Sequence, residues 1–322
     1  MTSFIIRRLL IGLLLLWGAS LMGFSIMKAA PGDYFDRLRM DPRVSQEFIE
    51  QLRQRYRLDD HVLIQYGAWL WRFVQLDFGE SFEYMLPVNK VIGSRLVNTL
   101  VLNLLAIAFT WAIAIPIGIY AAVRQYSLGD KILSALAFVG MSLPSFFSAL
   151  LLLYIFSAVL GWLPTGGLTS LDHDELSFGG KLADYAKHLV IPVSVLSLMA
   201  LAGLQRITRG NMLEVLRQQY ITTARAKGLS ERRVIYKHAL RNAVNPLITI
   251  FGYQFAAMFS GAALLEIIIN YPGLGSLMLT AIRSQDQFLV MGGFMMGAIM
   301  LLVGNLLAEI LLAVVDPRIS YS

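Results

Sequence analysis

With 322 residues, of which 57% are hydrophobic and only 15% charged, the sequence has the composition of an integral membrane protein and not of a soluble domain with a large core. The absence of cysteine excludes disulfides and thiolate metal sites from this chain. The formal net charge of +6 does not indicate nucleic-acid binding, because almost all of the excess falls in one segment, Arg206 to Asn245.

The chain opens with Arg7-Arg8 and an uncharged run from Leu9 to Met27. One interpretation is a cleaved signal peptide. The run is longer than the roughly 7–15 residues of a signal-peptide core, and Pro31 follows Ala29-Ala30, where cleavage would be expected. The pattern therefore favours a retained first transmembrane helix within residues 1–30, with its N-terminus in the cytoplasm.

Residues 31–95 mix acidic and basic side chains and contain an aromatic run from Tyr66 to Phe73. We expect a small extracytoplasmic subdomain here. The aromatic run fits two positions, one at the membrane interface and one packed within the subdomain, and the sequence does not decide between them.

Five further apolar segments are long enough to cross a membrane. Pro116 and Pro144 fall inside two of them and are expected to kink the helices. With the first helix they predict an all-α protein of six transmembrane helices with both termini in the cytoplasm. The five segments run at about 96–123, 132–160, 189–208, 247–269 and 288–315.

The segment from Arg206 to Asn245, which we call the basic loop, carries nine Lys and Arg side chains against two Glu. A basic segment between two crossings faces the cytoplasm. Gly228 permits a left-handed helix end and Ser230 can cap a following helix, so residues 209–245 are predicted to form a helix–turn–helix pair. A protein docking site is favoured, although an amphipathic pair that touches anionic lipid has the same features.

Motifs for catalysis do not occur. The sequence has no phosphate-binding Gly-x4-Gly-Lys-Ser/Thr loop, no His-Glu-x-x-His and no Gly-x-Ser-x-Gly. Its four histidines are widely separated along the chain, which argues against a zinc site. We therefore expect neither a catalytic site nor a bound metal or cofactor in this chain.

The basic loop resembles the EAA loop of ABC-importer permeases, which reads Glu-Ala-Ala-x3-Gly-x9-Ile-x-Leu-Pro. In this chain Thr222-Thr223-Ala224 and Gly228 stand at the first positions, and His238 and Arg241 replace Ile and Pro. With these departures the segment resembles the variant of the motif in the dipeptide, oligopeptide and nickel permease subfamily. Further stretches resemble the same subfamily: Phe78-Gly-Glu-Ser81, Arg95 to Thr99, Tyr271-Pro-Gly-Leu-Gly275 with Asp286, and Asn305, Glu309 and Asp316-Pro317-Arg318.

The resemblance implies a type I ABC-importer permease, translocating peptides or a related small solute across the bacterial inner membrane. It also implies its partners: a second, paralogous permease, two cytoplasmic ATP-binding subunits that carry ATP and Mg, and an extracytoplasmic solute-binding protein. The EAA loop would act as a coupling helix seated on an ATPase. Thr222 stands where the general motif has Glu, so a salt bridge from that Glu has no counterpart here. The docking residues implied are Thr223, Ala224, Arg225, Ala226, Lys227, Gly228, Leu229 and Ser230.

Polar residues inside the expected spans are candidates for a translocation path or gate: Asn98, Gln254, Glu266 and Glu309. Each of them also has a structural interpretation, as a hydrogen-bonding group between helices, a buried acid or a solvated helix end. The alternative function for the whole chain is a stand-alone secondary transporter or channel whose basic loop binds lipid.

Overall fold

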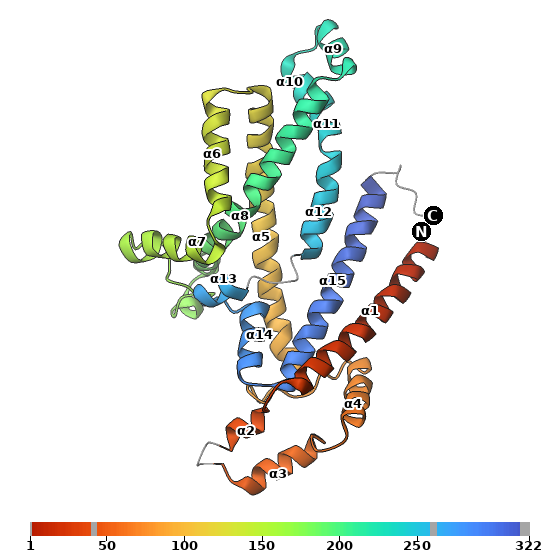
Figure 1. Cartoon of the computed structure of the whole chain (residues 1–322). Helices are drawn as coiled ribbons and strands as arrows, with labels where there is room; N and C mark the ends of the chain where they lie inside the picture. Colours follow the sequence, from red (N-terminus) through yellow and green to blue (C-terminus); the bar gives the residue numbers. More distant parts are fainter. Residues whose placement is uncertain (1, 40–43, 258–262, 316–322) are drawn as a thin grey trace. The chain divides into compact units, whose positions relative to one another are not determined.

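The computed structural model describes residues 2–39, 44–257 and 263–315, and this part of the chain forms helices joined by loops (Figure 1). The chain divides into two compact units, and the long helices α5 and α15 contribute to both. The first unit contains α1 (Thr2–Ala29), α2 (Tyr34–Leu38), α3 (Gln46–Arg55), α4 (Val62–Val74), α5 (Val88–Val123) as far as Thr99, α14 (Leu274–Arg283), and α15 (Gln287–Val315) as far as Val303.

The second unit contains the rest of α5 and α15 and the helices between them. In chain order these are α6 (Leu128–Ser142), α7 (Ser145–Leu152), η1 (Leu153–Val159), η2 (His173–Glu175), α8 (Phe178–Leu216), α9 (Gln219–Ala226), α10 (Glu231–Arg233), η3 (Val234–Ala239), α11 (Leu240–Ala243), α12 (Asn245–Ala257) and most of α13 (Ala263–Ile268).

Four described helices are long and apolar enough to cross a membrane, at Ile6–Asp36, Val88–Val123, Phe178–Leu216 and Gln287–Ile310. A fifth crossing is formed if α6 and the α7–η1 pair count as one broken span, with a bend of 106° between them. Pro144 lies at this bend, as expected, because it stands directly before α7. Pro116, in contrast, lies inside the continuous helix α5.

The observed helices differ from the expected segments at their ends. Helix α5 begins at Val88, before the expected start at 96, and α8 runs from Phe178 to Leu216, well beyond 189–208. The Ser177 side chain caps α8 by accepting a hydrogen bond from the Gly180 N–H at 3.3 Å, which explains the early start. The expected crossing at 247–269 contains α12 and α13, and residues 258–262 between them lie outside the described part.

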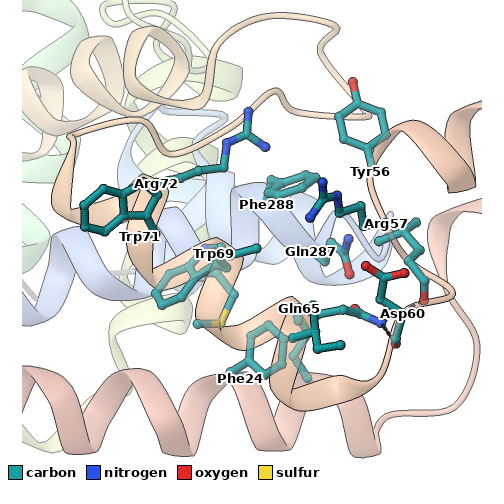
Figure 2. A pocket seen from close by; sticks show the side chains of 15 residues that line it. Phe24, Tyr56, Arg57, Asp60, Gln65, Trp69, Trp71, Arg72, Gln287 and Phe288 are labelled. Atoms are coloured by element: carbon teal, nitrogen blue, oxygen red, sulfur yellow. Dashed lines mark hydrogen bonds between the residues drawn. The ribbon is translucent and has the colours of Figure 1, made fainter.

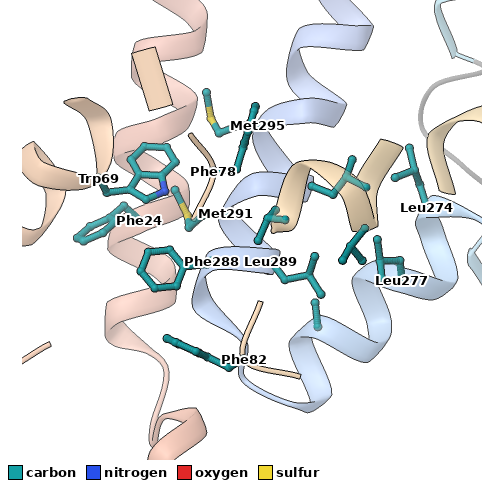
Figure 3. Close-up of a cluster of buried hydrophobic side chains, with 14 of the residues drawn as sticks. Phe24, Trp69, Phe78, Phe82, Leu274, Leu277, Phe288, Leu289, Met291 and Met295 are labelled. Atoms are coloured by element: carbon teal, nitrogen blue, oxygen red, sulfur yellow. The ribbon is translucent and has the colours of Figure 1, made fainter. Parts of the chain in front are cut away.

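Aromatic side chains form the core of the first unit (Figure 3). Phe24 of α1 lies against Tyr66 and Trp69 of α4, with ring centroids 5.4 and 6.3 Å apart. One face of the aromatic run is therefore packed within the chain. Trp71, on the other hand, is 67% exposed, so the run has both a buried and an open face.

In the second unit the crossing helices pack through small residues and leucines. Ala114 of α5, Leu204 of α8 and Leu247 of α12 are buried together. Pro246, in the first turn of α12, is tolerated there because that turn has no intrahelical acceptor for its nitrogen. Helix α8 leads into the basic loop, and α12 follows it.

Candidate functional site

The basic loop folds on a hydrophobic interior of its own. Helix α8 ends at Leu216, and α9, the short α10, the π-helical turn η3 and α11 follow. Their inward side chains pack against the end of α5. The buried members of this cluster are Ile119, Ala122, Met212, Ile221, Ala224, Val234, Ala239 and Ala243. The loop is thus a packed extension of α5 and α8.

The turn between α9 and α10 has the predicted backbone at Gly228. Its φ of +77° is left-handed, a conformation that glycine adopts without strain, and its N–H donates to the Arg225 carbonyl at 2.9 Å. Ser230 stands at the start of the second helix with an extended backbone, but its side chain makes no capping hydrogen bond. The first helix is also shorter than expected, because α8 ends and α9 begins anew at Gln219.

The structure divides the expected docking residues into outward and inward sets. Ala224 is only 7% exposed and Leu229 is half-buried, and both pack on the loop's interior cluster. These two residues hold the turn onto α5 and α8, and their part in docking stays a prediction. The exposed members are Thr223, Arg225, Ala226, Lys227, Gly228 and Ser230.

Arg225 spans the turn. Its Nε donates to Glu231 Oε1 at 2.7 Å and its Nη2 to Glu231 Oε2 at 3.3 Å, in a two-pronged ion pair. Both side chains are largely exposed, at 43% and 60%. Because solvent screens such a pair, we expect Glu231→Gln to lower the free energy of unfolding by no more than about 1 kcal/mol. Denaturation in mixed micelles measures this value, and a loss several times larger would show that the ion pair holds the loop together.

A buried carboxylate ties the link after α5 to α8. Asp130, 4% exposed, accepts hydrogen bonds from the Tyr126 N–H at 2.9 Å and from Arg209 Nη2 at 3.0 Å. It also accepts a longer bond from the Ser134 hydroxyl at 3.3 Å. Asp130 thereby fixes the helix that continues into the basic loop.

Asp130→Asn removes the charge that Arg209 and the Tyr126 N–H bind. Hydrogen bonds to a charged group contribute about 1.5–3 kcal/mol, so we expect the variant to lose about 2 kcal/mol of stability. Asp174→Asn is the matched control, because the side chain of Asp174 is fully exposed. Equal unfolding midpoints for the two variants in the same detergent would contradict the assignment.

The candidate path residues are engaged in the structure. Gln254 Oε1 accepts a hydrogen bond from Trp111 Nε1 at 2.8 Å, which joins α12 to α5. Asn98 Nδ2 donates to the Pro272 carbonyl at 2.9 Å. Glu266 is fully buried, which excludes the solvated helix end, and Glu309 is half-buried in α15. For Asn98 and Gln254 the structural interpretation, a hydrogen bond between segments, is the one observed.

Three of the stretches that resemble the permease subfamily have hydrogen bonds with one another in the first unit. Next to the Asn98 bond, the Leu274 N–H donates to Thr99 Oγ1 at 2.8 Å. A second pairing joins Ser81 to Asp286, whose Oδ2 accepts the hydroxyl at 2.6 Å and the Glu83 N–H at 3.0 Å. Hydrogen bonds between motifs that are distant in sequence thus hold the first unit together.

Gly79 makes the second pairing possible. Its φ is +84°, and a Cβ there would lie 2.8 Å from the Phe288 ring. The Gly79 N–H donates to Asp77 at 2.9 Å, and Arg72 donates to the same carboxylate at 2.9 Å. Burial raises the pKa of Asp77, but these two hydrogen bonds outweigh it and hold the pKa below the usual value.

Two histidines lie next to Asp184, and His188 Nδ1 is also 2.9 Å from the backbone carbonyl oxygen of Asp184. Asp184 lies 2.7 Å from His173 Nδ1 and 3.3 Å from His188 Nδ1, and it accepts two hydrogen bonds from Ser170. The spacing of the histidines in the sequence argues against a zinc site but does not show this arrangement, in which η2 brings His173 to Asp184 of α8. Within the described residues no group of three or more side chains is arranged to hold a metal ion.

Comparison with known proteins gives a family and full-length relatives. Residues 114–321 match the family described as "Binding-protein-dependent transport system inner membrane component". The chain is 43% identical to the oligopeptide transport system permease protein AppB of Bacillus subtilis, over 100% of both chains. It is 35% identical to the di/tripeptide transport system permease protein DppB of Pseudomonas aeruginosa, over 100% of this chain and 99% of that protein.

A solved structure supports the same fold. The MetNI methionine ABC transporter in an inward-facing conformation matches with a TM-score of 0.52 at 16% identity, covering 70% of this chain and 96% of that one. Its likeness concerns the fold alone. Together with the family match and the full-length relatives, these findings establish that the chain belongs to the binding-protein-dependent transport system inner membrane components and is a multi-pass permease subunit of an ABC importer in the bacterial cytoplasmic membrane.

Proposed function

We propose that this subunit translocates peptides, or a related small solute, by alternating access driven by separate ATPase subunits. The full-length identity of 43% to an oligopeptide permease carries this proposal. The di/tripeptide permease relative supports the same substrate class. In this proposal the chain itself binds no cofactor, and ATP and Mg belong to the partner subunits.

The basic loop would take up the movement of an ATPase. Its outward turn, from Thr223 to Ser230, offers the exposed side chains of Arg225, Ala226 and Lys227, while Ala224 and Leu229 anchor the turn to the interior. Helix α8 runs without a break from Phe178 to Leu216. A displacement of the basic loop by an ATPase is therefore transmitted to the membrane-crossing part of that helix. Rigid packing, rather than a hinge, supports this role.

The proposed topology has six crossings with both termini in the cytoplasm. The charge of +7 on the basic loop supports a cytoplasmic position for the end of α8 and the start of α12. Residues 31–87, which contain α2, α3 and α4, then face the other side, where a solute-binding protein approaches. The remaining crossing in this proposal is the expected segment at 247–269, in which α12 and α13 are described. Position 316, where the expected Asp-Pro-Arg motif begins, lies outside the described residues.

The complete transporter in this proposal contains a second, paralogous permease, two ATPases and an extracytoplasmic solute-binding protein. Reconstitution in liposomes tests the whole assembly. We expect uptake of a labelled tri- or tetrapeptide that requires external binding protein and internal ATP. Uptake at the same rate without the ATPases would contradict the proposal and favour a stand-alone transporter.

A further inference from the structure

Helix α4 has an apolar face that the chain does not cover. With about 100° per residue, Leu63, Ile64, Trp71 and Val74 fall on one side of the helix. Their exposed fractions are 70%, 54%, 67% and 67%. Figure 2 shows Trp69 beside Phe24, and Trp71 is among the side chains that line the same pocket. Large apolar side chains gathered on one face mark an interaction surface.

The other sides of α4 are occupied. Tyr66, Trp69 and Phe73 pack into the first unit's core. On the polar side, Gln65 Nε2 donates to the carbonyls of Leu58 and Asp60 at 2.8 and 2.7 Å, and Arg72 pairs with Asp77. On the open face, Ile64 and Trp71 also line the pocket drawn in Figure 2, whereas Leu63 and Val74 are not among its lining residues.

The contacts between α4 and α1 fix the depth of α4 in the membrane. The hydroxyls of Ser20 and Tyr66 are 2.9 Å apart, and Ser20 is fully buried. Ser20 lies seven residues before Met27, the end of the apolar run, which is about 10 Å along a helix. Phe24, the second contact, lies closer to that end. If α1 crosses the membrane as proposed, α4 lies at the depth of its last turns.

Helix α1, which carries α4, exposes large apolar side chains along the part that is proposed to cross the membrane. Its side chains Leu14, Met22 and Ile26 are 65%, 64% and 65% exposed, as expected for side chains that face acyl chains. By contrast, the neighbouring α3 exposes Glu47, Glu50 and Gln51 and belongs in water.

We propose that α4 is an interfacial membrane helix whose face of Leu63, Ile64, Trp71 and Val74 lies in the acyl-chain region of the leaflet opposite the basic loop. An amphipathic helix of this kind is immersed about 5–10 Å below the headgroups, and Trp is enriched at that level. The inference rests on the proposed crossing of α1. It gives the subdomain after α1 a second anchor, which holds it flat on the membrane surface.

The cysteine-free sequence offers a direct test. Leu63→Cys, Trp71→Cys and Val74→Cys would each carry a nitroxide label in the assembled transporter, reconstituted in liposomes with the partners' cysteines replaced. Collision with oxygen, which concentrates among acyl chains, is compared with collision with a water-soluble nickel chelate. Leu14→Cys on α1 is the lipid control and Gln51→Cys on α3 the water control.

We expect the three α4 labels to favour oxygen over the nickel chelate, as Leu14→Cys does, and Gln51→Cys to show the reverse. High nickel accessibility on α4 would overturn the inference in favour of a hydrated surface. Low accessibility to both reagents would overturn it in favour of a protein partner over this face. If Leu14→Cys itself favours nickel, the proposed crossing of α1 fails, and the inference fails with it.

Discussion

Ala226→Glu combined with Lys227→Glu is expected to release the ATPase subunits while the permease remains folded. Both side chains are exposed at the outward turn of the basic loop, and neither belongs to its interior cluster. The variant lowers the charge of the turn by three at the proposed contact. Loss of an interface hot spot costs about 2 kcal/mol or more, which weakens association roughly thirtyfold. Co-purification of the ATPases from mild detergent measures the change.

Tyr236→Glu combined with Lys237→Glu is the matched control. These two adjacent residues of η3 are also exposed, and the charge change is the same, but they lie away from the turn. We expect this variant to retain the ATPases. Equal retention by both variants, or equal loss, would show that the turn is not the specific contact. Substitutions at Ala224 are unsuitable for this purpose, because a larger side chain there would disrupt the buried cluster.

Asp286→Ala is expected to loosen the first unit. Asp286 is fully buried, and it accepts the Leu289 N–H at 3.0 Å in the first turn of α15 in addition to the Ser81 hydroxyl and the Glu83 N–H. The substitution removes a helix cap and leaves a backbone donor at Glu83 unpaired. Together these losses cost about 3 kcal/mol.

The loss is measured as the shift of the unfolding midpoint in mixed micelles. Ser45→Ala is the control, because Ser45 caps α3 through the Phe48 N–H at 3.2 Å but lies on the surface. We expect its loss to be about 1 kcal/mol. If Asp286→Ala shifts the midpoint no more than Ser45→Ala does, Asp286 does not fasten the loop at Ser81 to α15.

Local chemistry explains which features the sequence could predict. Hydropathy located the long helices, because a run of about 20 apolar residues is what a helix needs to cross a membrane. The left-handed turn at Gly228 and the bend at Pro144 follow from the backbone of single residues. Helix ends were less predictable. Helix α5 begins at Val88, inside the expected subdomain at 31–95, and the Ser177 cap starts α8 before the expected crossing at 189.

Features that depend on distant partners could not be predicted in the same way. Ala224 looked like part of an exposed motif, and its burial follows from Ile119 and Met212 on other helices. The sequence could not show that Trp111, 143 residues away, donates a hydrogen bond to Gln254, whose place in a path stays a prediction. Asp286 and Ser81 are 205 residues apart, and only their shared family resemblance linked them. Sequence periodicity shows which face of a helix is apolar but not what covers it.

A photo-crosslinking residue at position 227, compared with one at position 237, tests the central claim of ATP-driven coupling most directly. Both side chains are exposed on the basic loop, and only Lys227 lies in the proposed contact. The assembled transporter should give a crosslink from position 227 to an ATP-binding subunit and little or none from position 237. Crosslinks from position 227 to lipid alone, with the ATPases present and active, would contradict docking at this turn.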